Sequence, residues 1–557
     1  MKHRLLCAYA LLTTFAIAPN AVFAAPSTLD ASERTRVDAL FNDDNSHTPG
    51  CALGVFRDGT IAYARGYGMA DLEHGVPITP ASVFDVGSIS KQFAAAAITL
   101  LVEQHKLSFT DDVRKYIPEL PDYGAPITIN ELTWHTSGLR DYTSLLDLAG
   151  YGLEQAATDD DALKIQTRQR GLDFPSGTQY EYSNTNYFLL SVIVKRVSGQ
   201  TLAQFVRKYI FLPLGMTHTL YRDDFAMLIP NRAMGYAPAG KGIFKNSMSN
   251  WQQTGDGAVQ ISINDALKWD GNFYNPRVGG PEMLQQLQTP GRLSDGRPLT
   301  YGRGLFIENY RGLKLISHGG AWIGYRGQID RYPSVHTSVV VFCNSDASMP
   351  GSMARKVADV VLARYLKPVQ NRAGAKSTVS ATSVAGSYFN ETTGDVLNVV
   401  ARRGKVGLDF SGSFYALEPA GPTSFALGTS ILHFVVRQKG GVASELRMQG
   451  SDGMTGVAHR FTRVTPTAEQ LDGVTGSYYS RELDVTWKLR ADGNTVRIEP
   501  TRNLASGAAG KLQPQMADTF TSDRGFTIRF TRDTSHRITG FTLSAGRGLR
   551  SLTFTRV

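Results

Sequence analysis

The spacing of hydrophobic and polar residues divides the chain into two parts. In the first part, residues 51–56 and 61–65 flank a polar Arg-Asp-Gly-Thr turn, which predicts a β-hairpin. Residues 90–106 carry two apolar runs without glycine or proline, which predicts a buried helix. The same periodicities predict helices at 187–197, 201–210 and 353–365, and strands at 313–317, 325–331 and 337–343. Since strands lie at both ends of this part, we expect one sheet whose first and last strands are neighbours.

The second part of the chain repeats itself. Residues 368–382 show no periodicity and predict a linker. After it, Val-x-Gly-Ser-Tyr occurs at 384–388 and again at 474–478. Each copy opens a stretch of alternating apolar and polar residues separated by turns, which predicts two all-β, lipocalin-like barrel domains. The domain boundaries we expect are residues 25–367 for the catalytic domain, and 383–465 and 466–557 for the two barrels.

The first 24 residues have the pattern of a signal peptide. Lys2 and Arg4 precede an apolar run at residues 5–18, and short side chains end at Ala24. The apolar run is too short for a comfortable membrane span. The pattern therefore predicts cleavage after Ala24 and a periplasmic or secreted protein with no stable membrane insertion.

Composition and charge exclude several classes of protein. The chain has 557 residues, of which 42% are hydrophobic and 19% charged, as in a folded protein. The formal net charge is +9, but the basic residues are scattered and no basic stripe with interleaved aromatics occurs, so we predict no nucleic-acid partner. No metal-ligand spacing or nucleotide-binding fingerprint is present, so no metal and no cofactor are predicted.

Candidate chemistry begins with Ser88 and Lys91, at the start of the predicted buried helix. Positions i and i+3 share a helix face, so the lysine lies beside the serine. Burial and the positive end of the helix both lower the pKa of such a lysine towards a neutral amine, the base that a serine nucleophile needs. By itself the pattern is weak, because a capping serine and a surface lysine are more frequent.

Two further motifs strengthen this hypothesis. Tyr182 and Asn184 follow a turn-rich segment, where a tyrosine can relay a proton and an amide can hold a substrate carbonyl. His318 and Gly320 follow the predicted strand 313–317. A glycine there lets a substrate backbone lie along the strand edge, and the histidine can join the proton network. The alternatives are a loop aromatic packed under a turn and a hairpin with an incidental histidine.

Together, these three motifs resemble the penicillin-recognising serine hydrolases: class C β-lactamases, DD-peptidases, related esterases and D-aminopeptidases. Residues 132–139, 213–216 and 255–257 add supporting matches. The resemblance spans about residues 30 to 365. It implies an α/β (α+β) domain with a five-stranded antiparallel sheet flanked by helices. It also implies an oxyanion hole made by the amides of Ser88 and Ala321, and a scaffold role for His135.

Two cysteines, Cys51 and Cys343, each belong to a strand-like apolar run. The residues alone leave open a disulfide and two buried free thiols. The resemblance makes the first and last strands neighbours, which would bring these two cysteines close together.

The third motif bears on specificity. A lysine at position 318 would supply a fixed cation for a substrate carboxylate, whereas a histidine is mostly neutral near pH 7. Arg326 is a candidate to assist. The His-x-Gly form resembles D-aminopeptidases and esterases more than β-lactamases, and the two barrels resemble D-aminopeptidases, in which a loop of the last barrel shapes the pocket. Residues 500–511 are the candidate loop, and the sequence does not identify the acid that a substrate amine requires.

The sequence therefore predicts an exported serine hydrolase that acts through an acyl-enzyme. Ser88, Lys91, Tyr182 and His318 are the expected catalytic residues, and Asn184, Gly320 and Ala321 the expected substrate-binding residues. The leading substrates are short peptides or amides that carry a D-residue. The alternatives are an esterase on small acyl esters, a β-lactamase or DD-carboxypeptidase, and a catalytically silent protein that binds wall fragments or a partner.

Overall fold

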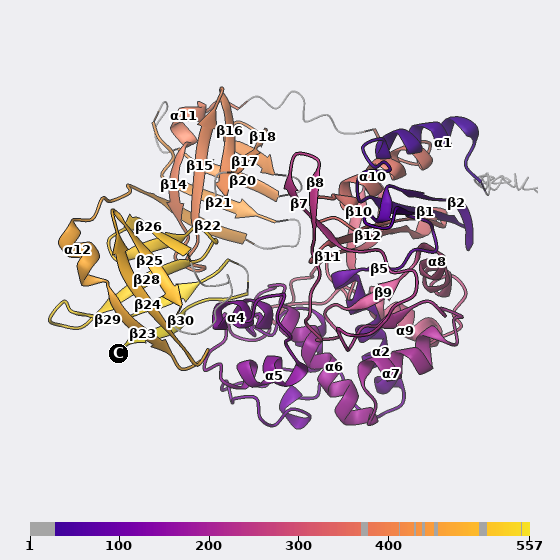
Figure 1. Ribbon diagram of the computed structural model, residues 1–557, viewed down its shortest axis with the longest axis horizontal. Helices are drawn as coiled ribbons and strands as arrows, with labels where there is room; N and C mark the ends of the chain where they lie inside the picture. Colours follow the sequence, from indigo (N-terminus) through magenta and orange to yellow (C-terminus); the bar gives the residue numbers. More distant parts are fainter. Residues whose placement is uncertain are drawn as a thin grey trace, which may run out of the picture.

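The protein folds into an α/β domain with two β units beside it (Figure 1). The computed structural model describes residues 28–368, 377–410, 413–427, 430–436, 441–450, 455–500, 510–546 and 548–557. The predicted signal peptide, most of the predicted linker, and residues 501–509 of the candidate loop lie outside these residues. In the part of the chain that the structure describes, no helix combines the length and hydrophobicity that crossing a membrane requires.

The central sheet is antiparallel, and among the described residues it has six strands in the order β10-β11-β12-β13-β1-β2. Their bounds are β1 Cys51–Arg57, β2 Thr60–Tyr67, β10 Phe306–Tyr310, β11 Leu313–Trp322, β12 Tyr325–Tyr332 and β13 Thr337–Cys343. The expected meeting of the first and last strands is confirmed, since Cys51 pairs with Cys343. The expectation of five strands is wrong, because β10 adds an edge strand. It folds back onto β11 through Arg311 and Gly312, which both have positive φ, as a tight hairpin turn requires.

Helices cover both faces of the sheet. Side chains alternate along each strand, so Phe56 and Val340 face the core that contains α2, whereas Leu53 and Val341 face α1 and α10. The helices of this domain are α1 Ala31–Asp38, α2 Lys91–Glu103, α3 Ile129–Thr133, α4 Tyr142–Ala149, α5 Asp159–Thr167, α6 Asn184–Ser198, α7 Leu202–Val206, α8 Ile263–Asn272, α9 Gly280–Gln288 and α10 Pro350–Val361. Small sheets are formed by β3 Met69–Asp71 with β4 Val76–Pro77, by β5 Phe84–Asp85, β9 Val259–Ile261 and β6 Leu220–Tyr221, and by β7 Tyr236–Gly240 with β8 Ile243–Asn246.

The predicted buried helix is confirmed as α2, whose four consecutive alanines from Ala94 to Ala97 have no exposed surface. It begins after the short 3₁₀ segment Gly87–Ser90. Small side chains let α6 and α9 approach α2 closely, so the 3₁₀ segment leads into a tightly packed helix.

The first β unit is barrel-like, but among its described residues hydrogen-bonded pairing does not close the sheet. Its elements are α11 Ala381–Val384, β14 Gly386–Phe389, β15 Val396–Arg402, β16 Lys405–Phe410, β17 Ser413–Ala416, β18 Glu418–Pro419, β19 Ser424–Leu427, β20 Ser430–Val435, β21 Glu445–Gln449 and β22 Thr455–Phe461. In the described residues these strands form one nine-stranded sheet with β17 and β18 at its two edges. β17 pairs with β16, whereas β18, which follows β17 after Leu417, pairs with β19. A bend of the chain at Leu417 therefore stands where the predicted barrel would have its last pair of hydrogen-bonded strands.

The second β unit is a closed barrel of eight antiparallel strands in sequence order. Its elements are α12 Ala468–Gly473, β23 Gly476–Ser480, β24 Val485–Asp492, β25 Thr495–Pro500, β26 Gly510–Met516, β27 Thr519–Ser522, β28 Thr527–Arg532, β29 Ile538–Ser544 and β30 Leu552–Arg556. The two units share local geometry: the hydroxyl of Tyr388 donates to Val384 O at 2.7 Å, and that of Tyr478 to Val474 O at 2.9 Å. The repeat seen in the sequence is therefore also a structural repeat.

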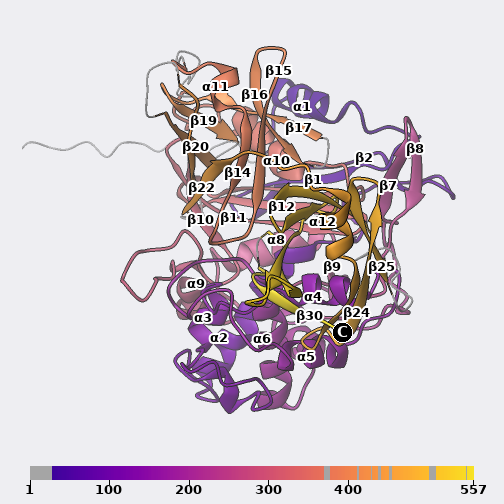
Figure 2. The same cartoon turned by 90° about the vertical axis from the view of Figure 1, so that its left-hand side faces the viewer.

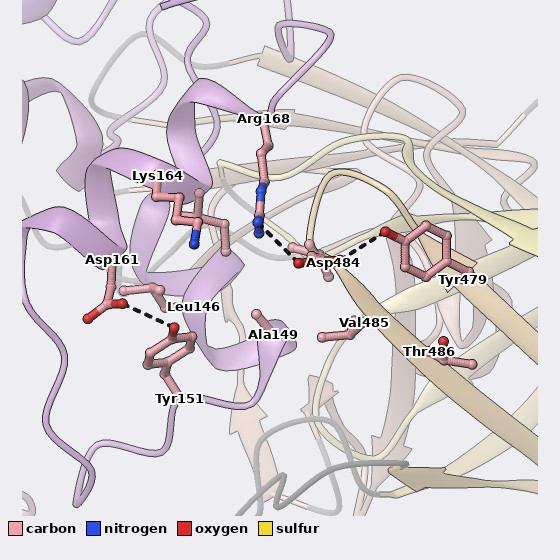
Figure 3. A pocket seen from close by; sticks show the side chains of 12 residues that line it. Leu146, Ala149, Tyr151, Asp161, Lys164, Arg168, Tyr479, Asp484, Val485 and Thr486 are labelled. Atoms are coloured by element: carbon pink, nitrogen blue, oxygen red, sulfur yellow. Dashed lines mark hydrogen bonds and ion pairs between the residues drawn. The ribbon is translucent and has the colours of Figure 1, made fainter. Parts of the chain in front are cut away.

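The second barrel lies against the helices of the α/β domain, and the first unit lies above it in both views (Figures 1 and 2). A cavity of about 630 Å³ separates α4 and α5 from β23 and β24. At its edge the Arg168 guanidinium donates to Asp484 at 3.1 Å, and the Tyr479 hydroxyl donates to the same carboxylate at 2.9 Å (Figure 3).

Candidate active site

Ser88 lies in the 3₁₀ turn directly before α2, which places it one turn from Lys91. The turn is held at both ends, because Asp85 accepts the Gly87 amide at 2.9 Å and the Ser90 hydroxyl donates to Gly87 O at 2.6 Å. Gly87 has φ +48, and a Cβ on it would lie 2.9 Å from Ala321 N. The turn therefore requires glycine at this position, and it brings Ser88 beside β11.

Lys91 is fully buried, and its ammonium nitrogen has three oxygen neighbours. The Nζ atom lies 3.0 Å from Ser88 Oγ, 2.9 Å from Asn184 Oδ1 and 2.8 Å from Asp256 O. Two of these oxygens, those of Asn184 and Asp256, only accept hydrogen bonds. A neutral amine that donates to both must turn its lone pair towards the Ser88 hydroxyl. The arrangement is that of a base aimed at a nucleophile.

Burial also sets the charge of Lys91. Loss of hydration lowers its pKa to about 8, against the opposing pull of the Asp256 and Asp141 carboxylates. The pKa of Asp256 is raised to about 7, again chiefly by burial. A lysine with a pKa near 8 is partly neutral in weakly alkaline solution, as a general base must be.

Tyr182 lies over the Lys91 side chain, with Nζ 4.8 Å from the ring centroid. Burial holds the pKa of its hydroxyl well above 10, although interaction with the Ser88 hydroxyl lowers it. The hydroxyl is buried and has no hydrogen-bond partner among the described residues. His135 stacks beneath the ring at 4.1 Å and accepts the Ser183 amide at 3.2 Å, so it lies where a scaffold residue is needed. Tyr182 therefore stays protonated and can pass a proton on.

Asn184 begins α6. Asp141, which is not among the predicted site residues, holds it in position. The backbone amide of Asn184 donates to Asp141 Oδ2 at 2.6 Å. Asp141 Oδ1 caps α4 by accepting the backbone amide of Thr143 at 2.9 Å. Asp141 lies two residues after the segment 132–139, which supports the family resemblance. The helix-capping preference of aspartate was the available signal.

The edge of β11 that faces Ser88 carries the third motif. β10 pairs with β11 only as far as Ser317, so residues 318–322 have no strand on that side among the described pairings. A Cβ on Gly320 would lie 1.9 Å from Val86 O, so only glycine permits this approach. The Ala321 amide lies beside the Ser88 turn, where the predicted oxyanion hole requires it.

His318 is buried beside Tyr182 and near Lys91, and it is uncharged. Its Nδ1 lies 2.6 Å from Gly319 O and its Nε2 lies 3.0 Å from the Tyr301 hydroxyl. A carbonyl accepts only, so Nδ1 carries the proton and Nε2 accepts from Tyr301. Burial and the nearby Lys91 lower the pKa of His318 to about 3. The Gly319 carbonyl fixes this tautomer, and Tyr301, which no sequence motif marked, donates to the unprotonated Nε2.

Arg326, the candidate helper for a substrate carboxylate, already has partners. Its guanidinium donates to Trp322 O and Tyr325 O, both at 2.7 Å, and to Asp346 at 3.0 Å. These contacts neutralise much of its charge and fix it at the β11–β12 turn.

Asp256 is the acid near Lys91 with a free oxygen. Its Oδ2 accepts from the Tyr142 hydroxyl at 3.0 Å, whereas its buried Oδ1 has no hydrogen-bond partner in the described part of the chain. The Gly-Asp-Gly match at residues 255–257 indicated this position in the sequence, but it did not indicate a chemical role for the Asp256 carboxylate. The described residues also hold no group of three or more histidine, cysteine or acidic side chains arranged to bind a metal.

Comparison with known proteins agrees with this geometry. The protein family described as Beta-lactamase matches residues 30–363. The chain therefore belongs to the beta-lactamase family, as its three motifs predicted.

Its relatives extend the similarity beyond the first domain. The D-aminopeptidase of Gluconobacter oxydans is 30% identical over 346 residues, 62% of this chain and 64% of that protein, so the match spans just under two thirds of the relative. A D-aminopeptidase of Cereibacter sphaeroides is 30% identical over 507 residues, 87% of this chain and 89% of that protein. An octameric penicillin-binding protein homologue from Pyrococcus abyssi shares the fold, with a TM-score of 0.55 at 22% identity over 85% of this chain and 98% of its own.

Proposed function

We propose that this protein is a serine peptidase or amidase that cleaves short peptides or amides carrying a D-residue. The observation that carries the proposal is the orientation of Lys91, whose two fixed acceptors direct its lone pair at Ser88 Oγ. The similarity to a D-aminopeptidase along 87% of the chain, β units included, supports the substrate class.

In the proposed acylation, neutral Lys91 takes the proton of Ser88 as Oγ attacks the substrate carbonyl carbon. The carbonyl oxygen gains a negative charge, which the amides of Ser88 and Ala321 stabilise. Asn184 orients both Lys91 and the substrate.

The tetrahedral intermediate then loses its amine. Tyr182 donates its hydroxyl proton to the leaving nitrogen and regains one from protonated Lys91, so the C–N bond breaks and an acyl ester of Ser88 remains. Water attacks this ester with Lys91 and Tyr182 as the base system, which releases the acid and restores Ser88. His318, neutral and held by Tyr301, shapes the wall beside Tyr182 in this scheme.

The charge of the third motif supports an amine-recognising enzyme over a β-lactamase or DD-carboxypeptidase. Those enzymes hold a substrate carboxylate, but the pKa of His318 is about 3 and Arg326 is committed to Asp346. Asp256 Oδ1 is our candidate partner for the substrate amine.

We also propose that the protein is exported to the periplasm or secreted. The Cys51–Cys343 disulfide supports this, because disulfides persist in oxidising compartments. Cell fractionation of the full-length protein with a cytoplasmic marker tests it, and recovery with the cytoplasmic marker would contradict it.

A substrate panel on the purified protein tests the function. The panel contains D-alanine p-nitroanilide, its L-isomer, a short acyl ester and a chromogenic cephalosporin. We expect turnover of the D-anilide above the L-isomer, and loss of that turnover in Ser88→Ala.

Each other outcome has a defined meaning. Turnover that survives in Ser88→Ala contradicts the mechanism. Preference for the ester without stereoselectivity replaces the peptidase with the esterase alternative, and preference for the cephalosporin replaces it with the β-lactamase. Inertness towards the whole panel, with no labelling of Ser88 by a fluorophosphonate, favours a silent binding protein.

A further inference from the structure

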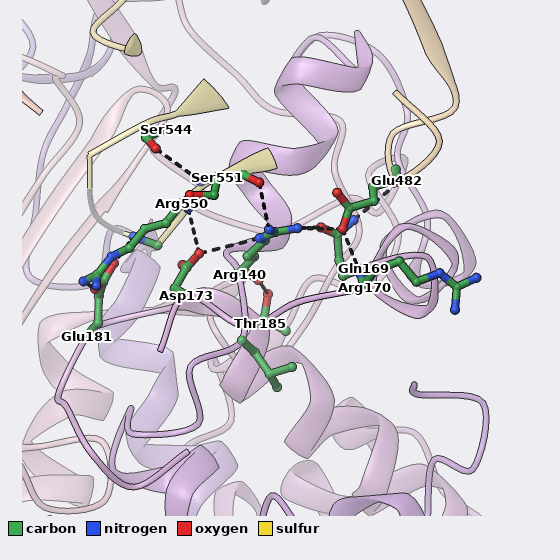
Figure 4. A network of polar contacts seen from close by, with 12 residues as sticks. Arg140, Gln169, Arg170, Asp173, Glu181, Thr185, Glu482, Ser544, Arg550 and Ser551 are labelled. Atoms are coloured by element: carbon green, nitrogen blue, oxygen red, sulfur yellow. Dashed lines mark hydrogen bonds and ion pairs between the residues drawn. The ribbon is translucent and has the colours of Figure 1, made fainter. Parts of the chain in front are cut away.

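Gly548 and Arg550, in the loop of the second barrel between β29 and β30, contact the segment that carries Tyr182 and Asn184. Gly548 O accepts the Asp141 amide at 2.6 Å, and the Gly548 amide donates to Glu181 Oε1. The Arg550 guanidinium donates to Glu181 Oε2 (Figure 4). This loop is distinct from the predicted candidate loop, residues 500–511, most of which lies outside the described residues. We call Gly548 and Arg550, with Glu181 and Asp141, the interdomain clamp.

The clamp grips both ends of the catalytic segment. Glu181 directly precedes Tyr182, and its amide donates to His135 O at 2.9 Å. Asp141 receives the Asn184 amide at 2.6 Å. Residues 181 and 184 are therefore both tied to one short loop of another domain. Gly548 fits so closely that a Cβ on it would lie 3.0 Å from Asp141 Cβ.

The charges of the clamp are removed from water. The Glu181 side chain is 5% exposed and that of Arg550 11%. Arg550 also donates its amide to Asp173 Oδ1 at 2.6 Å, and buried Asp173 lies 3.6 Å from the Arg140 guanidinium. A buried ion pair fixes the positions of its two side chains only while both are present. Removing one partner leaves the other charge buried without compensation. Loss of Arg550 would thus release Glu181 from its present position.

We propose that Arg550, acting through Glu181, is a positioning residue that keeps Tyr182 and Asn184 in register with Ser88 and Lys91. The inference rests on the proposed function only for its turnover readout. The second barrel then completes the active site of the first domain without touching the reacting atoms.

The test compares Arg550→Met with Arg168→Met in the full-length protein. The control variant breaks the Arg168–Asp484 pair, which joins the same two domains away from Tyr182. Three readouts are used: the rate at which a fluorophosphonate labels Ser88, kcat and KM on the best panel substrate, and hydrogen exchange of the peptide spanning residues 180–186.

For Arg550→Met we expect labelling and kcat to fall about 10- to 100-fold, since small misplacements of catalytic groups have effects of that size. KM should change less than about threefold, and residues 180–186 should exchange faster. Arg168→Met should leave all three readouts near wild type. Arg550→Lys, which keeps the charge but not the fork, should restore part of the loss. Arg550→Met/Glu181→Gln should lose no more than Arg550→Met alone, because the two residues act as one pair.

The proposal is overturned if Arg550→Met labels and exchanges like wild type, or if Arg168→Met loses as much activity as Arg550→Met. Failure of the proposed function is a separate result: a wild-type protein that labels at Ser88 but cleaves no D-anilide. In that case labelling and hydrogen exchange still decide the clamp.

Discussion

Lys91 is fully buried, and its amine nitrogen lies within hydrogen-bonding distance of three oxygens. The partners do not neutralise it, because all three are uncharged oxygens and the carboxylates of Asp141 and Asp256 act only at longer range. Desolvation therefore prevails over attraction, and the pKa falls to about 8. His318 follows the same rule, since a buried imidazole beside a cationic lysine loses its proton.

The pH dependence of activity tests the role of Lys91. Below pH 8 the lysine is protonated and cannot accept the Ser88 proton, so kcat/KM should rise with pH and level off above about 8. The Asp256 carboxylate raises the pKa of Lys91, so Asp256→Asn should move the rising limb to lower pH. Asp295→Asn, at an exposed loop, should leave the limb in place. A limb that moves to higher pH in Asp256→Asn would contradict the assignment.

The substitution Gly320→Ala tests how closely β11 must approach the turn that carries Ser88. A Cβ there would lie 1.9 Å from Val86 O, so Gly320→Ala must push the two segments apart. We expect kcat/KM to fall about 100-fold and the free energy of unfolding to fall by about 1–3 kcal/mol. Gly271→Ala is the matched control, because a Cβ in that part of α8 meets open space. Its stability should stay within about 1 kcal/mol of wild type. Steady-state kinetics and thermal unfolding distinguish the two variants.

At the scale of elements, the sheet brings together strands from the two ends of the domain. β1 and β13 pair along seven residues, and the Cys51–Cys343 disulfide joins them across a separation of 292 residues. The residues alone left a disulfide and two free thiols open, and pairing of the strands decides for the disulfide. The catalytic turn depends on this sheet, because β11 is two strands away from β13.

Removal of the disulfide should destabilise the first domain. Cys51→Ala/Cys343→Ala should lower its free energy of unfolding by about 2–4 kcal/mol, since the unfolded chain is no longer cross-linked. Denaturant unfolding of the variant, compared with reduced and oxidised wild type, measures this. Mass mapping of unfolded, unreduced protein should find Cys51 and Cys343 joined by a disulfide, and finding both as free thiols would contradict the pairing.

At the scale of the whole molecule, the second barrel docks through buried charge. Arg140 of the first domain donates to Glu482 of the second barrel at 2.7 Å, and its side chain is 5% exposed. Arg168 and Asp484 form a second pair on the same interface that is largely open to water. The two pairs differ in burial far more than in length.

That difference predicts unequal effects on stability. Glu482→Ala removes the nearer carboxylate of buried Arg140 and leaves only Asp173, at 3.6 Å, so it should lower the stability of the docked state by about 3 kcal/mol, with the domains unfolding in separate transitions. Asp484→Ala should cost only about 0–1 kcal/mol and leave the transitions unchanged. Scanning calorimetry of both variants tests this, and equal effects would refute the role of burial.

Much of this protein follows from local sequence. The i, i+3 spacing of Ser88 and Lys91 places them on one turn in any helix, and apolar runs specify α2, β1 and β13. The duplicated Val-x-Gly-Ser-Tyr motif marks the same tyrosine hydrogen bond in both β units. The sixth strand, β10, was not predicted, although its turn lies within a short stretch of sequence. Arg311 and Gly312 form this hairpin turn, and of the two only glycine is typical of such a turn.

Contacts between distant residues were decided only by the tertiary structure. Lys91 receives its orientation from Asn184 and Asp256, 93 and 165 residues away, and its low pKa from a burial that no window of sequence measures. The choice of the loop that carries Arg550 likewise depends on how a closed barrel docks. Sequence by itself determines which groups are available and which neighbours along the chain share a face. Distance, desolvation and charge compensation arise between segments, so the fold alone decided which of these groups act together.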